Sequence, residues 1–263
     1  MNVHFAGVEP GAASPLARLD PRLKLPMTLG LIAGITLAPE RAWAAYALLW
    51  GLLALLAARA GLTPWRLGRK AALALPFTLA ATGLIFTTPG APLFALGGLT
   101  ATAEGLARFA SIALRSWLAV QAALLLGQTT PLPDLLDAAR WLRVPETLVA
   151  ITGFMLRYLA LLGDEATQLQ RARAARSGVL PGYRPGGRLP WRARVTGGMV
   201  GNLFLRAYER SERVYAAMLA RGYGFSVPAR HRPPPRWADA LQAALPVLAA
   251  LLIDLAALLW TRA

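Results

Sequence analysis

The sequence of 263 residues contains no cysteine and only two histidines, His4 and His231. Without cysteine the chain has no disulfide framework, thiolate metal site or cysteine nucleophile. Two histidines this far apart do not predict a histidine-based metal cluster or catalytic triad. The only lysines, Lys24 and Lys70, do not follow a glycine, as the lysine of a Walker A loop does. We therefore expect the chain to bind no metal ion, nucleotide or other cofactor by itself.

Charged residues are also scarce, at 16% of the chain, whereas 56% of the residues are hydrophobic. A transmembrane helix needs about 20 predominantly apolar residues. The apolar runs that approach this length are Leu25–Ala38, which is the shortest, Ala42–Ala58, Ala71–Thr87, Leu106–Gln128 and Leu241–Trp260. The sequence therefore predicts an all-α integral membrane protein with about five transmembrane helices.

The charge that is present is strongly basic, with a formal net charge of +15. If the five spans alternate, 24 of the 28 arginines and lysines fall on one side, and the loop Thr87–Ala103 on the other side has none. Basic residues gather on the cytoplasmic side of membrane proteins. We therefore expect a cytoplasmic N-terminus and a lipid bilayer, not a nucleic acid, as the partner of these charges.

This topology divides the chain into four segments. We expect a cytoplasmic N-terminal arm over 1–24, four transmembrane helices over 25–128, a cytoplasmic region over 129–239 and a last transmembrane helix over 240–263. The arm ends in Asp20-Pro21, and these residues suit the N-cap and first position of a helix.

The cytoplasmic region is expected to contain two long amphipathic helices. Apolar residues recur at helical spacing from Leu148 to Leu169 and again from Val195 to Leu219, and the intervening segment is rich in glycine and proline. Thr147–Leu162 is apolar apart from Arg157, so a buried or interfacial helix and a short span both fit. We favour the former, because a span here would move the basic residues that follow to the wrong side.

Each long helix ends in a short basic segment, and we call these two segments the tips. The first tip is Ala175-Arg176-Ser177-Gly178 and the second is Ala220-Arg221-Gly222. Alanine keeps the helix end slim, arginine offers a planar fork of donors for a carboxylate, and glycine allows the left-handed turn that stops a helix. Ordinary helix caps would have the same composition, but two tips on consecutive helices favour docking sites for a partner.

A second function class depends on Asp134 and Asp137, which lie at the start of a short predicted helix. This pair could chelate a divalent ion in a lipid-modifying membrane enzyme. The segment lacks a second acidic pair, and aspartate in the first turn of a helix also stabilises the helix dipole. Metal-dependent turnover by the isolated chain would distinguish this enzyme from a docking protein.

Three charged residues lie inside predicted spans, where isolated charges are costly and usually face protein or water. Arg108 and Arg115 are seven residues apart and share a helix face, and Asp254 falls between them in depth. We expect an arginine–aspartate pair that ties the fourth span to the last one.

Four segments resemble the T component of energy-coupling factor (ECF) transporters, and most closely its cobalt-uptake type, CbiQ. They are Leu19–Lys24, Leu142–Pro145, Arg157–Leu159 and above all Glu209–Tyr223. The resemblance spans nearly the whole chain. It implies a multi-pass, non-catalytic scaffold of the bacterial inner membrane that links two ABC ATPase subunits to a membrane substrate-binding subunit. ATP and Mg would be bound by the partner ATPases.

The resemblance also implies roles for the tips, which in this family dock in grooves of the ATPases. Ala220-Arg221-Gly222 matches the family signature fully, whereas Ser177 replaces the glycine that the family has at the first tip. By resemblance the first choice of substrate is cobalt, followed by nickel and then a vitamin. Recognition of the substrate would belong to the partner subunit.

Overall fold

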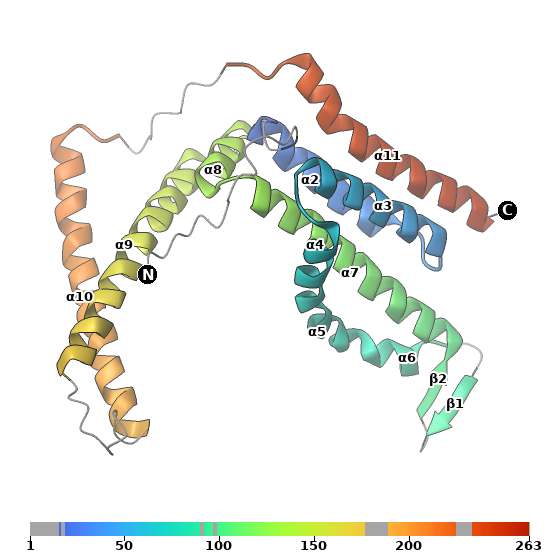
Figure 1. Cartoon of the computed structure of the whole chain (residues 1–263), viewed down its shortest axis with the longest axis horizontal. Coiled ribbons are helices and arrows are strands. Elements are labelled where there is room, and N and C mark those ends of the chain that lie inside the picture. The colour runs from blue at the N-terminus through green and yellow to red at the C-terminus, as the bar shows by residue number, and fades with distance from the viewer. Residues whose placement is uncertain are drawn as a thin grey trace. The chain divides into compact units, whose positions relative to one another are not determined.

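A computed structural model describes residue 16 and residues 19–89, 92–96, 99–176, 189–224 and 233–262 (Figure 1). The chain divides into two compact units. The bundle unit comprises Ala6–Leu142 and Arg230–Ala263, and the helix-pair unit comprises Met1–Phe5 and Arg143–Ala229.

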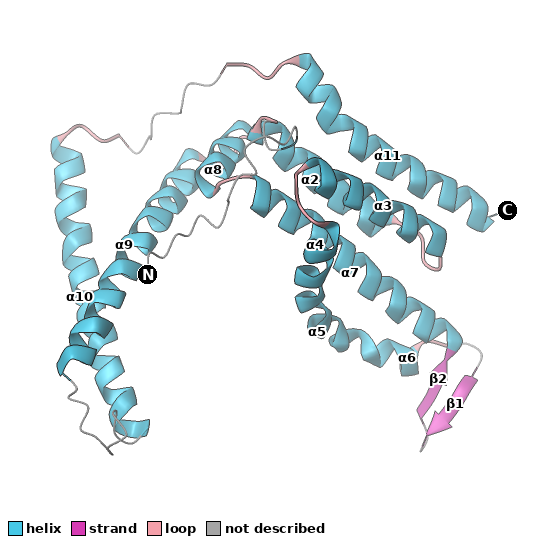
Figure 2. Cartoon of the chain, in the orientation of Figure 1, coloured by secondary structure: helices cyan, strands magenta, loops and turns pink. Residues whose placement is uncertain are grey.

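The bundle unit is mainly helical (Figure 2). Its longer helices are α2 (Pro21–Leu37), α3 (Trp43–Arg59), α4 (Pro64–Ala71), α7 (Ala103–Thr129), α8 (Leu132–Trp141) and α11 (Trp237–Arg262). Its shorter elements are η1 (Ala72–Ala74), α5 (Leu75–Thr78), η2 (Leu79–Gly83), α6 (Leu84–Thr87), β1 (Pro92–Leu96) and β2 (Leu99–Thr102). The two strands pair antiparallel, and this hairpin was not expected from the sequence.

Local side-chain chemistry explains where two of these helices begin. Asp20 accepts a hydrogen bond from the backbone N–H of Arg22 at 2.9 Å, and Pro21 is the first residue of α2, which confirms the expected N-cap. Thr102 caps α7 in the same way, because its hydroxyl accepts a hydrogen bond from the N–H of Gly105 at 3.1 Å. Each cap satisfies a backbone donor that has no partner inside its helix.

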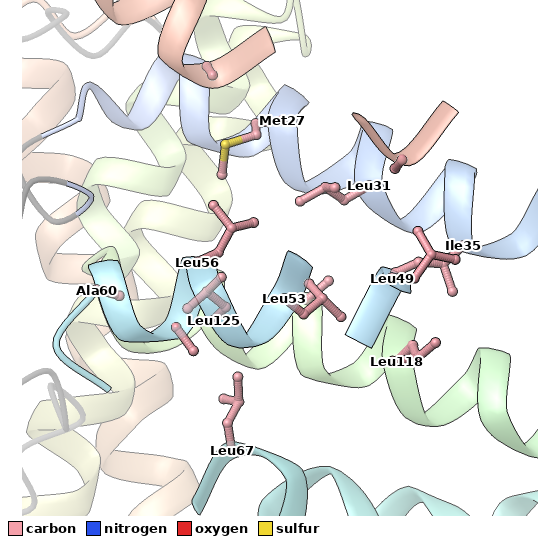
Figure 3. Close-up of a cluster of buried hydrophobic side chains, with 14 of the residues drawn as sticks. Met27, Leu31, Ile35, Leu49, Leu53, Leu56, Ala60, Leu67, Leu118 and Leu125 are labelled. Carbon is pink, nitrogen blue, oxygen red and sulfur yellow. The ribbon is translucent and has the colours of Figure 1, made fainter. Parts of the chain in front are cut away.

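The core of the bundle unit lies where α2, α3 and α7 meet (Figure 3). Leu31, Leu49, Leu53 and Leu118 are each at most 2% exposed. In a bilayer the lipid is as apolar as these leucines, so helix association depends on close packing rather than on removal from water. The interdigitated leucines supply that packing.

Helix α11 approaches α2 closely at a glycine. A Cβ atom built on Gly30 would lie 2.9 Å from Cγ1 and 3.1 Å from Cγ2 of Val247. One turn later, a Cβ on Gly34 would lie 3.4 Å from the Cβ of Ala250. Small residues of this kind let two helix backbones pack tightly in a membrane.

Replacing Gly30 by alanine is expected to destabilise the bundle unit by about 1–3 kcal/mol, because the added methyl group overlaps Val247. The matched control is Gly51→Ala in α3, where a Cβ would meet nothing within 4 Å. The midpoint of thermal unfolding in detergent measures both variants. Equal stability of the two would show that the α2–α11 contact does not require a glycine.

The helical membrane-protein class is confirmed. Among the residues that the structure describes, three helices are long and apolar enough to cross a membrane, namely α7, α11 and α9 (Glu146–Arg176), or four if α3 and α4 form one span bent by 120°. Both α2 and α3 have 17 residues, the short end of the range for a span.

The expectation of one continuous helix over Ala71–Thr87 is wrong. This stretch is a series of short α- and 3₁₀-helical pieces, η1, α5, η2 and α6. Pro76 lies within α5, where it removes a backbone donor and crowds the preceding turn. The hydroxyls of Thr78 and Thr82 donate hydrogen bonds to the carbonyls three residues earlier, at 2.7 Å in both cases. Apolar composition predicted a regular helix here, but the proline and the threonine hydroxyls interrupt it.

Candidate functional site

The helix-pair unit consists of α9 and α10 (Leu189–Ala220). The two helices run antiparallel and cross, as Figure 1 shows. Near the end of α9, Arg173 lies over the ring of Trp191 at 5.9 Å and donates a hydrogen bond to Thr196 at 3.4 Å. Farther along, Arg210 of α10 forms an ion pair with Glu165 of α9.

The second tip has the helix-stopping geometry that the sequence predicted. Gly222 adopts a φ of +75°, and its N–H donates to the carbonyl of Leu219 at 2.9 Å. The N–H of Tyr223 donates to the carbonyl of Met218 at 3.0 Å. These two bonds form a Schellman cap, which ends α10 and leaves the Arg221 side chain exposed.

Aromatic packing holds the second tip against the other helix. The rings of Tyr223 and Phe154 meet edge to face, with centroids 6.3 Å apart and planes inclined by 78°. Phe154 lies in the first third of α9, so the end of α10 is anchored near the start of α9. Arg221 is thereby presented from a fixed helix end.

The first tip is described only in part. Helix α9 continues through Ala175 to Arg176, and both residues are exposed. Ser177 and Gly178 lie outside the described residues, so the expected turn after Arg176 stays a prediction. Because α9 and α10 are antiparallel and Tyr223 packs against Phe154, their C-terminal ends are separated by the stretch of α9 from Phe154 to Arg176, about 33 Å.

Both helices expose large apolar side chains. Those of α9 include Leu148, Ile151, Met155 and Leu159, and those of α10 include Val200, Phe204, Leu205, Tyr208, Tyr215 and Leu219. Phe204 is 67% exposed. Extended apolar surfaces of this kind mark contacts with a membrane or another protein. The helix-pair unit thus combines two basic ends with apolar flanks.

The charged residues of the bundle unit find partners that the sequence did not reveal. Arg108, near the start of α7, lies 3.3 Å from Glu40. It is therefore paired with a turn residue and not with Asp254. Arg115 instead donates from Nε to the hydroxyl of Tyr46 at 3.0 Å, and that hydroxyl donates to a backbone carbonyl at 3.0 Å. Tyr46 could not have been found from charge spacing, because it is neutral and lies on α3.

Asp254 is buried in the bundle unit at 5% exposure and does not face lipid. Among the described residues its carboxylate oxygens have no hydrogen-bond partner. Arg115 acts on Asp254 electrostatically without forming an ion pair within 4.0 Å. The expected ion pair between Asp254 and either arginine is therefore not formed, and Arg115 is the arginine whose charge acts on Asp254.

The aspartates proposed for an enzyme are already engaged with cations. Asp137 lies 3.9 Å from Arg140 one turn later in α8. Asp134 is in the first turn of α8 and interacts with the charge of Lys24. Within the described ranges no group of three or more potential metal-ligating side chains is found. The positive charges of Lys24 and Arg140 oppose the binding of a divalent ion at Asp134 and Asp137. The described residues therefore do not support the enzyme hypothesis.

The fold and the site define a multi-pass helical membrane protein with an exposed pair of long helices, and comparison with known proteins agrees. The sequence model of the cobalt transport protein family, CbiQ, matches residues 12–233. The chain belongs to this family and is an ECF transporter T component.

Individual relatives carry three different names. The chain is 32% identical over 148 residues to the energy-coupling factor transporter transmembrane protein EcfT of Exiguobacterium sibiricum, covering 53% of this chain and 55% of that protein. It is 29% identical over 161 residues to the cobalt transport protein CbiQ of Rhodobacter capsulatus, covering 60% and 63%. It is 34% identical over 95 residues to the nickel permease LarQ of Lactiplantibacillus plantarum, covering 36% and 32%. The matched part is less than two thirds of each of these relatives.

Proposed function

We propose that this chain is the coupling subunit of an ECF-type importer for a divalent transition-metal ion. In this proposal α9 and α10 lie on the cytoplasmic side, and each presents its C-terminal arginine to one of two ABC ATPase subunits. The ATPases bind ATP and Mg, and a separate membrane subunit binds the substrate. The chain itself is not an enzyme.

The observation that carries the proposal is the geometry of the two helix ends. Arg221 is exposed beside a Schellman cap, and Arg176 is exposed at the opposite end of the same helix pair. An exposed arginine at a helix C-terminus suits a carboxylate-lined groove, because its guanidinium binds carboxylates bidentately. A separation of about 33 Å gives each arginine its own partner subunit.

The mechanism follows from the stiffness of the two helices. When ATP closes the ATPases, the two docked ends would move with them. Because α9 and α10 are packed against each other, this motion would be transmitted along both helices to the apolar surfaces that contact the substrate-binding subunit and the membrane. The exposed side chains of Phe204 and Tyr208 on α10 suit such a contact.

For the substrate we propose cobalt, with nickel as the alternative. Relatives whose names include cobalt and nickel support this metal-ion class. Within the described ranges the chain has no cluster of metal-ligating side chains, and we assign recognition of the ion to the partner subunit.

Co-purification tests the proposed partners. We expect the tagged chain, extracted from its native membrane in mild detergent, to retain an ATPase. The double variant Arg176→Ala/Arg221→Ala should lose it, because both docking arginines are removed. The control is Arg206→Ala, which removes another exposed arginine of α10 away from both ends. Retention of the ATPase by the double variant would refute the docking role of the tips.

A further inference from the structure

A half-buried ion pair links the middle regions of the two long helices. Nη2 of Arg210 on α10 donates to Oε1 of Glu165 on α9, and the side chains are 29% and 18% exposed. The two residues are 45 positions apart in the sequence. The contact therefore joins two helices rather than bracing one of them.

Buried packing contributes little to fixing how the described parts of α9 and α10 cross. Among the described residues α10 has no buried residue, and α9 has only Val149 and Ala150. Apolar contacts slide with little cost when they are not interlocked, whereas an arginine–carboxylate bond is directional and specifies register. Other cross-helix contacts, those of Arg173 with Trp191 and Thr196 and of Phe154 with Tyr223, lie toward the ends of the pair.

The surroundings of the pair make it sensitive to the loss of either partner. Besides the bonded atoms, Oε2 of Glu165 and Nη1 of Arg210 are buried and have no hydrogen-bond partner among the described residues. Removing one side chain would leave the other charge half-buried and unpaired, which is costlier than losing both together. An exposed pair on the same helix, Glu209 with Arg213, lies at 66% and 70% exposure and has no such constraint.

We propose that Glu165 and Arg210 are positioning residues that set the crossing of α9 and α10 and thereby the separation of the two tips. This inference rests on the proposed coupling function. The pair touches neither ATPase nor substrate in this account. It acts by keeping the helix ends in the one arrangement that engages both ATPase subunits at once.

Because the sequence contains no cysteine, spin labels attach only to cysteines that are introduced. Cysteines introduced at the exposed positions Gln170 of α9 and Ala216 of α10 would carry spin labels. Pulsed electron paramagnetic resonance on the full chain in its ATPase complex then reports the distance between the helices. Uptake of radioactive cobalt by cells with the unlabelled variants reports coupling.

We expect Arg210→Gln to broaden and shift the distance distribution and to lower uptake on the order of tenfold, as a half-buried charge loses its partner. The matched control Arg213→Gln should change neither. The charge-reversed variant Glu165→Arg/Arg210→Glu should restore both measurements toward those of the parent chain. A misfolded Arg210→Gln variant would also lose activity. Recovery in the charge-reversed variant therefore distinguishes loss of the ion pair from misfolding.

Three outcomes would overturn the inference. An unchanged distance distribution in Arg210→Gln would show that the pair does not set the crossing. An altered distribution with normal uptake would show that the crossing does not govern coupling. If the charge-reversed variant recovered in neither measurement, the effect of Arg210→Gln would not be due to its pairing with Glu165. Failure of the proposed function itself is seen separately, as normal uptake when Arg176 and Arg221 are both alanine.

Discussion

Replacing Arg221 by alanine is expected to lower cobalt or nickel uptake by at least about thirtyfold while leaving insertion into the membrane unchanged. Arg221 is exposed at the end of α10, so its loss removes no contact inside the described chain that the fold needs. An arginine at the centre of an interface contributes about 2 kcal/mol or more, which corresponds to this factor. Uptake of the radioactive ion by cells measures the effect, with immunoblotting of membranes to check the amount of protein.

The matched control for Arg221→Ala is Arg213→Ala, because Arg213 is a 70% exposed arginine two turns earlier on the same helix. Its exposed pair with Glu209 contributes less than about 1 kcal/mol, so uptake should remain close to the parent value. If Arg221→Ala transports as well as Arg213→Ala, the second tip is an ordinary helix cap and the docking account fails.

Replacing Arg115 by leucine is expected to destabilise the bundle unit by about 3 kcal/mol. The change removes the hydrogen bond from Arg115 to Tyr46 and the positive charge that acts on the buried Asp254. A buried charge that loses its compensating partner costs about 3–5 kcal/mol. The midpoint of thermal unfolding of the purified chain in detergent measures the loss.

Two companion variants identify the cause of that loss. Arg108→Leu should cost less than about 1 kcal/mol, since Arg108 and Glu40 are both 48% exposed. Arg115→Leu/Asp254→Leu should recover most of the stability, because no unpaired charge remains. A double variant as unstable as Arg115→Leu alone would show that Arg115 acts through Tyr46 and not through Asp254.

Features encoded by neighbouring residues could be predicted from the sequence. The cap at Asp20-Pro21 and the left-handed stop at Gly222 each depend on a few consecutive residues, and both are present. The two long helices were predicted from apolar spacing that persists over many turns. Arg221 was named as a candidate for the same reason, because its proposed role depends only on its place at a helix end.

Features that depend on distant residues could not be predicted. The partner of Arg210 is 45 positions away, and the partner of Arg115 is an uncharged tyrosine 69 positions away. No spacing rule connects such residues before the helices are packed. The prediction for residues 71–87 was wrong for a different reason. It followed the apolar composition of the stretch and gave too little weight to Pro76, which interrupts a helix.

Site-specific cross-linking identifies which protein contacts each helix end. Single cysteines at Ala175 and Leu219, both exposed and within two residues of the tip arginines, would carry a photoactivatable cross-linker in the otherwise cysteine-free chain. A cysteine at the exposed Leu252 of α11 is the control. We expect an ATPase to be cross-linked at both tips and none at Leu252. Tips that cross-link only to lipid, or to no ATPase, would contradict the proposed docking role.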